Sequence, residues 1–141
     1  MVGYPGETED DFSLTLAAVE AIAFAYLHQF TYSTRPGTEA GGPDAQPTCR
    51  TSTAARVEAL RELGARKALD FAGRFVGRRL TCVIERDRKS GAHIAVSENY
   101  IKIALVPSPL DERREGTLCT VELLDASRRP ARGRLEHLRT G

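Results

Sequence analysis

The sequence lacks any apolar run long enough to cross a lipid bilayer. A membrane-spanning helix needs at least about eighteen consecutive apolar residues, and no such stretch occurs among the 141 residues. The opening residues MVGYPGE have neither a basic start nor an apolar core, so they are not expected to be a signal peptide. These absences exclude a membrane-spanning protein and make a cytosolic location the prediction.

Cysteine is also scarce. Cys49, Cys82 and Cys119 lie more than thirty residues apart. An odd number at such spacing is neither a disulfide framework nor a metal-ligand cluster. The three residues are therefore interpreted as reduced thiols that pack as small apolar side chains.

The composition is that of a globular protein, with 41% hydrophobic and 28% charged residues. The length allows one domain, or one small domain and a piece of another. Charge is unevenly spread: residues 1–73 hold 6 Lys and Arg against 10 Asp and Glu (6 − 10 = −4), whereas residues 74–141 hold 14 against 9 (14 − 9 = +5). An anionic partner is expected in the basic half.

The acidic half alternates loops and helices. Residues 2–8 form a glycine- and proline-rich loop, and a helix over 8–23 is predicted behind a Thr8 N-cap. Residues 25–30 suit a strand, which would complete a βαβ fragment whose first strand is nearly missing. The breaker-rich stretch 31–47 is predicted to be a loop or linker. A second helix is predicted over 52–71, with Ser52 or Thr53 as its N-cap.

The basic half is predicted to be a small closed barrel. Short apolar runs separated by turns give five candidate strands, at 79–85, 92–97, 100–106, 117–124 and 131–138. Five strands in so short a segment can support an OB-like antiparallel barrel. The fold class is therefore α+β.

Three stretches resemble the radical S-adenosylmethionine methylthiotransferases. Residues 2–12 (VGYPGETEDDF) are similar to the family pattern VGFPGET-x-x-x-F, and residues 27–38 (LHQFTYSTRPGT) to LHVFPYS-x-RPGT. Residues 98–102 (ENYIK) are similar to a segment of the family's TRAM domain, a small RNA-associated β-barrel. The second and third stretches look most like the branch that acts on threonylcarbamoyladenosine in tRNA.

The resemblance implies an enzyme that adds a 2-methylthio group to the modified adenosine beside the anticodon, using S-adenosylmethionine and two 4Fe–4S clusters. Such clusters need closely spaced cysteine thiolates, and the three cysteines here cannot supply the family's CxxxCxxC motif. We therefore expect a C-terminal fragment that binds no cluster by itself, holds no catalytic residue and is inactive alone. Its expected partner is the tRNA anticodon stem-loop, and a monomer is expected.

The resemblance divides the chain into a radical-barrel remnant (1–47), a linking helix (48–73) and the TRAM barrel (74–141). It also implies that the first loop lines the S-adenosylmethionine pocket, through Gly3, Tyr4, Pro5, Gly6 and Glu7. The alternative is a glycine–proline turn that caps a helix. Two further candidates have equally plain alternatives: His28 is a ligand or a packed strand histidine, and Arg35 binds an anion or belongs to a simple turn.

RNA binding is predicted for basic, amide and aromatic side chains of the barrel: Arg78, Arg79, Lys89, Asn99, Tyr100, Lys102, Arg132 and Arg134. Further arginines, Arg86, Arg88, Arg128, Arg129 and Arg139, accompany them. The alternative is a solvated barrel surface with Tyr100 in the core. Two other hypotheses stay open, a stand-alone RNA-binding TRAM module and a nonfunctional remnant that folds only from about Ser52.

Overall fold

The first helix, α1 (Glu9–Ala21), begins where the sequence predicts it. The computed structural model describes residues 1–42, 49–88, 90–107 and 115–138. Thr8 is the N-cap: its hydroxyl accepts the Asp11 N–H at 3.1 Å, and the Asp11 carboxylate accepts the Thr8 N–H at 2.9 Å. This reciprocal capping box satisfies two backbone donors that the helix cannot satisfy itself.

The second helix, α2 (Arg50–Gly73), starts earlier than predicted. Ser52 and Thr53 are not N-caps, because both lie inside the first turn and donate their hydroxyls to the Cys49 carbonyl, at 2.9 and 3.0 Å. A short 3₁₀ helix, η1 (Glu39–Gly41), lies in the predicted linker. Among the described residues, neither α-helix is both long and apolar enough to cross a membrane.

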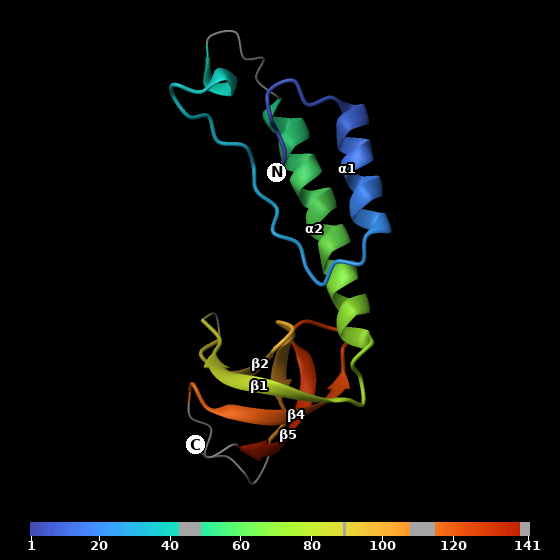
Figure 1. The fold of residues 1–141 in the computed structure, drawn as a ribbon, viewed down its shortest axis with the longest axis vertical. Helices are drawn as coiled ribbons and strands as arrows, with labels where there is room; N and C mark the ends of the chain where they lie inside the picture. The colour runs from blue at the N-terminus through green and yellow to red at the C-terminus, as the bar shows by residue number, and fades with distance from the viewer. Residues whose placement is uncertain (43–48, 89, 108–114, 139–141) are drawn as a thin grey trace. The chain divides into compact units, whose positions relative to one another are not determined.

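The chain forms two compact units, an N-terminal unit (Met1–Ala68) and a barrel unit (Leu69–Gly141), drawn in Figure 1. In the N-terminal unit, α1 and α2 enclose a small cluster made by Val2, Phe12 and Leu60. The loop that carries Val2 runs beside the segment after α1. The Val2 N–H donates to the Phe30 carbonyl at 2.8 Å, and the Tyr32 N–H donates to the Val2 carbonyl at 2.7 Å.

The strand predicted at residues 25–30 is wrong. The described part of this segment forms a single parallel bridge, between Val2 and Thr31. A parallel strand is stable when its ladder continues and both faces are covered, and one bridge supplies neither. The segment is nevertheless extended, with Leu27 against Gly64 of α2 and Phe30 exposed. A βαβ remnant of a radical barrel therefore stays a prediction.

The five strands of the basic half form a closed barrel in the order β1-β2-β3-β5-β4. They are β1 (Arg79–Arg86), β2 (His93–Ser97), β3 (Lys102–Leu105), β4 (Leu118–Asp125) and β5 (Ala131–Leu138). The prediction of five strands is confirmed, but the barrel is not wholly antiparallel, because β3 and β5 pair in parallel. That parallel pair closes the barrel after the chain has crossed from β3 to β4.

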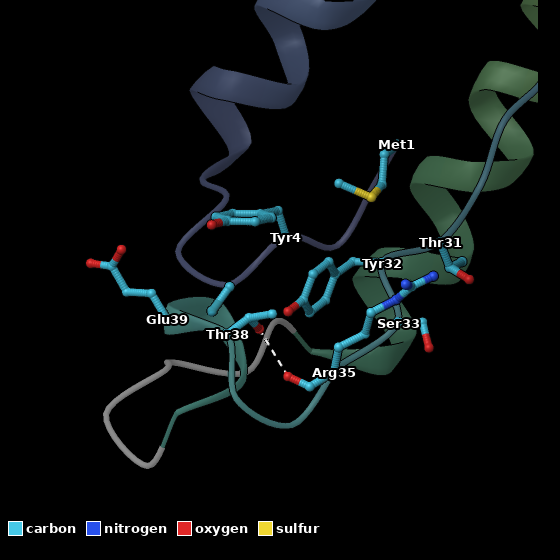
Figure 2. Close-up of a pocket in the computed structure, with 9 residues that line it drawn as sticks. Met1, Tyr4, Thr31, Tyr32, Ser33, Arg35, Thr38 and Glu39 are labelled. Carbon is cyan, nitrogen blue, oxygen red and sulfur yellow. Dashed lines mark hydrogen bonds between the residues drawn. The ribbon is translucent and has the colours of Figure 1, made fainter.

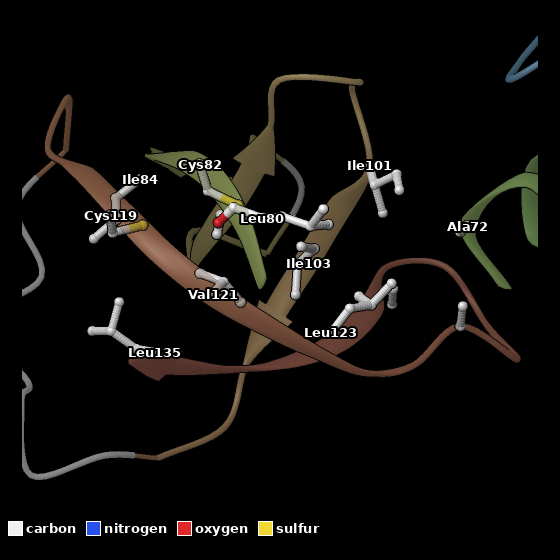
Figure 3. Packing of buried hydrophobic residues seen from close by; sticks show 13 residues of the cluster. Ala72, Leu80, Cys82, Ile84, Ile101, Ile103, Cys119, Val121, Leu123 and Leu135 are labelled. Atoms are coloured by element: carbon white, nitrogen blue, oxygen red, sulfur yellow. The ribbon is translucent and has the colours of Figure 1, made fainter. Parts of the chain in front are cut away.

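Alternate side chains of the strands point into the barrel and make its core (Figure 3). Ile84, Ile103 and Leu123 are fully buried there. Gly133 lets β5 approach this core closely, since a Cβ at this position would lie 2.6 Å from side-chain carbons of Ile103 and Val121. The last turns of α2 contribute Ala72 and Phe71 to the same cluster.

Candidate functional site

The strand registers bring most of the predicted RNA-binding residues to one end of the barrel. Lys102 pairs with Val96, Ile103 with Ala131, and Arg79 with Glu122. The first residues of β1, β3 and β5 therefore lie at the same end of the barrel as the last residues of β2 and β4. Six of the predicted residues lie at this end: Arg78, Arg79, Asn99, Tyr100, Lys102 and Arg132.

The other two predicted residues are not part of that group. Arg134 lies further along β5 and pairs with Glu122 at 3.4 Å. Lys89 lies outside the described residues. Arg79 also has an acidic neighbour, Glu136 at 3.6 Å, and the guanidinium of Arg78 lies 5.7 Å from the centre of the Phe75 ring. An exposed ion pair such as Arg79–Glu136 is weak, so the Arg79 charge remains accessible to a phosphate.

A groove of about 590 Å³ lies over the outer face of β2 and β3. Its lining includes apolar side chains, Ile94, Ala104 and Leu105, and two cationic ones, Lys102 and Arg129. The lining is completed by the start of β2, the turn between β1 and β2 and the turn between β4 and β5, through His93, Asp87, Ser90, Ala92 and Pro130. In OB-folds the face of strands 2 and 3, with these two turns, is where oligonucleotides bind.

The turn between β4 and β5 concentrates positive charge around one carboxylate. Asp125 accepts the Ser127 N–H at 2.9 Å, and hydrogen bonds from Ser127 lower the pKa of the Asp125 carboxyl, with smaller contributions from Arg128 and Arg132. An ionised Asp125 thus fixes the turn that carries Arg128 and Arg129. Arg128 and Arg132 therefore lie near a carboxylate, that of Asp125, which is already hydrogen-bonded within its own turn.

Tyr100 is exposed, at 69% of its maximum, in the turn between β2 and β3. The alternative that Tyr100 belongs to the barrel core is therefore wrong. Its neighbour Ile101 is the buried residue of this turn, and Ile103 follows it into the core.

The GYPGE loop of the N-terminal unit is held in place by one of its own predicted ligand residues. The Glu7 carboxylate accepts the Gly3 N–H at 2.8 Å and the Arg56 Nη1 at 2.6 Å. Arg56, only 5% exposed, also bonds Glu9 at 2.6 Å, and the hydrogen bonds to Glu9 and Glu7 raise the pKa of its guanidinium. We call Glu7, Arg56 and the Gly3 N–H the loop clasp. Glu7 therefore positions the loop.

The two motif loops of the N-terminal unit meet around one cavity (Figure 2). It measures about 440 Å³, and Tyr4 of the first loop and Tyr32, Ser33 and Arg35 of the second line it. The rings of Tyr4 and Tyr32 meet edge to face, with centroids 5.2 Å apart. A second cavity of about 510 Å³ is lined by Gly3, Pro5 and Tyr32 among others. Both loops thus line shared cavities, as a common ligand site requires, whereas His28 instead lies in an exposed aromatic row between Tyr26 and Phe30.

The cysteine positions do not fit an iron–sulfur cluster. Cys82 and Cys119 face each other in the register of β1 and β4, inside the core. Burial raises the pKa of the Cys82 thiol to about 12 and raises that of Cys119, whereas hydrogen bonds at the start of α2 lower the pKa of the exposed Cys49. In the described ranges, no three His, Cys, Asp or Glu side chains lie together as metal ligands would.

Sequence reasoning missed two parts of these sites. The burial of Arg56 could have been predicted, because this residue lies four positions before Leu60 on the apolar face of α2. A cation at such a position must be paired when it is buried. The apolar floor of the groove, Ile94 and Ala104, gave no signal, since both read as ordinary strand residues.

Comparison with known proteins finds relatives along nearly the whole chain. It is 31% identical over 133 residues to the tRNA-2-methylthio-N(6)-dimethylallyladenosine synthase of Zymomonas mobilis, covering 94% of this chain and 29% of that protein. The protein of the same name from Thermobifida fusca is 36% identical over 132 residues, covering 90% and 26%. The chain belongs to the tRNA methylthiotransferase family.

Membership in the family confirms the resemblance, but the relatives do not separate its branches. A threonylcarbamoyladenosine tRNA methylthiotransferase of Treponema pallidum is 36% identical over 106 residues, 75% of this chain and 21% of that protein. Both substrate names therefore occur among the relatives, so the branch stays a prediction. The chain spans between 21% and 29% of the length of these three proteins, and no family model matches it.

Proposed function

We propose that this chain is the C-terminal part of a tRNA methylthiotransferase and that its barrel supplies the RNA-binding surface. The observation that carries the proposal is the groove over β2 and β3, where Lys102 and Arg129 flank an apolar floor. Phosphates attract the cations, and the floor accepts the faces of bases. The basic surplus of residues 74–141 supports the same assignment.

The proposed substrate is N6-threonylcarbamoyladenosine next to the anticodon, so the proposed partner is the tRNA anticodon stem-loop in the cytoplasm. Residues 27–38 and 98–102 support this branch, as does the name of the Treponema pallidum relative. The names of the other two relatives favour dimethylallyladenosine instead. Mass spectrometry of tRNA from cells with and without the gene distinguishes them, because the two methylthiolated nucleosides differ in mass.

In the intact enzyme, we propose that Tyr4 and Tyr32 form part of the wall of the S-adenosylmethionine pocket. The cavity between the two loops offers aromatic faces for the adenine and the Arg35 guanidinium for a carboxylate. S-adenosylmethionine, with the 4Fe–4S clusters, supplies the radical and methylthiolation chemistry when bound. The residues of this chain contribute by orienting the cofactor, and the loop clasp keeps the Gly3–Glu7 loop in position.

RNA titration tests the proposed barrel function. The full chain is expected to bind a labelled anticodon stem-loop with an affinity that falls as salt rises. Lys102→Ala and Arg129→Ala are each expected to reduce the logarithmic salt slope by about 0.7–0.9, one phosphate contact each. Arg61→Ala, which removes an exposed cation from α2, is the matched control and is expected to leave the slope unchanged. An affinity independent of salt would contradict the proposal.

A second candidate is a stand-alone RNA-binding module without a modification role. The closed barrel favours it, since none of its strands needs a partner from another polypeptide. This candidate predicts RNA binding as above, but no change in tRNA methylthiolation when the gene is deleted. The third hypothesis, a nonfunctional remnant, predicts no RNA binding and no change in tRNA methylthiolation.

A further inference from the structure

Tyr100 adopts a backbone conformation that tyrosine rarely takes. Its φ is +63°, and it is the non-glycine residue of positive φ among those that the structure describes. Bulky side chains are disfavoured there, whereas glycine and asparagine tolerate the left-handed region. A residue in such a conformation persists when its surroundings fix it.

The turn around Tyr100 supplies that fixation. The Tyr100 N–H donates to the Ser97 carbonyl at 2.8 Å, and the Ile101 N–H donates to the Ser97 hydroxyl at 2.9 Å. The same hydroxyl donates to the Asn99 side-chain oxygen at 2.6 Å, and Ser97 is itself buried. Burial of Ile101 anchors the far side of the turn. The backbone of Tyr100 is thus held while its ring is exposed to solvent.

The position of the turn relates Tyr100 to the groove. Lys102, which lines the groove, follows two residues later at the start of β3. Arg129 lines the groove from the turn before β5, and β5 starts beside Ile103. A strand of RNA lying across Ile94 and Ala104 between these cations would therefore reach the end of the barrel where Tyr100 is exposed.

We propose that the Tyr100 ring is a stacking platform for an unpaired nucleobase, so the groove takes single-stranded RNA such as a loop or a bulge. This inference rests on the proposed RNA-binding function and specifies its ligand. Bases within a duplex are already stacked on both faces, whereas an unpaired base offers a free face to an aromatic ring. The fixed turn lowers the entropic cost of stacking because the platform is ordered beforehand.

Three variants of the full chain distinguish the contribution of the Tyr100 ring to RNA affinity from an effect on folding. Tyr100→Phe keeps the ring and is expected to keep the affinity for a ten-nucleotide uridine oligomer. Tyr100→Leu keeps apolar bulk without a planar ring, and Tyr100→Asn suits the positive φ without a ring. Both are expected to lose about 10-fold in affinity for the oligomer and to bind a blunt-ended RNA duplex, which has no loop, as the wild type does.

The matched control removes an exposed apolar side chain from the opposite end of the barrel. Leu118→Ala at the start of β4, where the side chain is 47% exposed, is expected to leave both affinities unchanged. Thermal unfolding of each variant checks that the barrel folds, and Tyr100→Asn is expected to be at least as stable as the wild type.

The outcomes separate this inference from the proposed function. If Tyr100→Leu and Tyr100→Asn bind the oligomer as tightly as the wild type while Lys102→Ala weakens it, the platform is wrong and the proposed function survives. If the wild type prefers the blunt-ended duplex, the assignment to unpaired bases is wrong. If the wild type binds neither RNA, both proposals fail.

Discussion

The two compact units differ in how completely their extended segments are paired and in how fully their apolar side chains are buried. In the barrel, each of the five strands has a partner on both sides, and the core residues Ile84, Ile103 and Leu123 are fully buried. In the N-terminal unit, the extended segment after α1 makes one bridge among the described residues, while Leu14 and Phe30 are 70% and 65% exposed.

Closure of the hydrogen-bond ladder accounts for this difference. A closed barrel leaves no strand edge and encloses its own core, so a short segment of chain is sufficient. The N-terminal unit relies instead on α-helix packing against one loop and on the ionic loop clasp. The barrel should therefore be self-contained, whereas the N-terminal unit should depend on a few local contacts.

Thiol reactivity should give the largest contrast. Cys49 is exposed with a lowered pKa, whereas the pKa of Cys82 is raised to about 12 by burial. At pH 8 the thiolate fraction of Cys82 is therefore far below that of Cys49. Iodoacetamide labelling followed by mass spectrometry is expected to modify Cys49 first. In denaturant the three thiols should react alike, and rapid native labelling of Cys82 would show that the barrel opens.

Truncation in the barrel core should be the next largest effect. Ile103→Ala removes a fully buried side chain and is expected to lower the free energy of unfolding by about 2–5 kcal/mol. Leu14→Ala, an exposed side chain of α1, should change it by less than about 0.5 kcal/mol. Denaturant unfolding followed by circular dichroism measures both. Equal effects of the two substitutions would remove the contrast between the units.

Breaking the loop clasp should loosen the N-terminal unit and spare the barrel. Arg56→Ala leaves Glu7, 11% exposed, without its cation. Local opening should then make chymotrypsin cleavage at Tyr4 or Phe30 roughly tenfold faster. Arg61→Ala removes an exposed pair of the same helix and serves as the control. If Arg56→Ala leaves the cleavage rate unchanged, the clasp does not hold the loop.

Acidification should produce the smallest effect, at the capping box of α1. Hydrogen bonds from Thr8 lower the pKa of Asp11 below its usual 3.8. A carboxyl with a lowered folded pKa stabilises the fold above its unfolded pKa, and this contribution is lost as pH falls through the folded pKa. The hydrogen-exchange protection factors of the α1 amides, which correct for the intrinsic pH dependence of exchange, should therefore fall below about pH 4 in the wild type. Asp11→Asn should be destabilised at pH 7 and lose that pH dependence.

Much of the barrel was predictable from the sequence because its signals are local. Short strand-like runs separated by turns gave the five strands within about two residues at each end, and Thr8 with Asp11 gave the start of α1. The wrong strand at residues 25–30 has the opposite cause. Its residues suit an extended conformation, but a strand also needs a neighbouring ladder, which no local pattern supplies.

The sequence alone determined the helix cap, the strand segments, the excess of positive charge after residue 73 and the motifs of the family, since each depends on residues close together in the chain. Only the tertiary structure decided the parallel pairing of β3 and β5, the burial of Arg56, the exposure of Tyr100 and the gathering of Lys102 and Arg129 around one groove. These features depend on which distant segments become neighbours, and barrel closure and helix packing determine that.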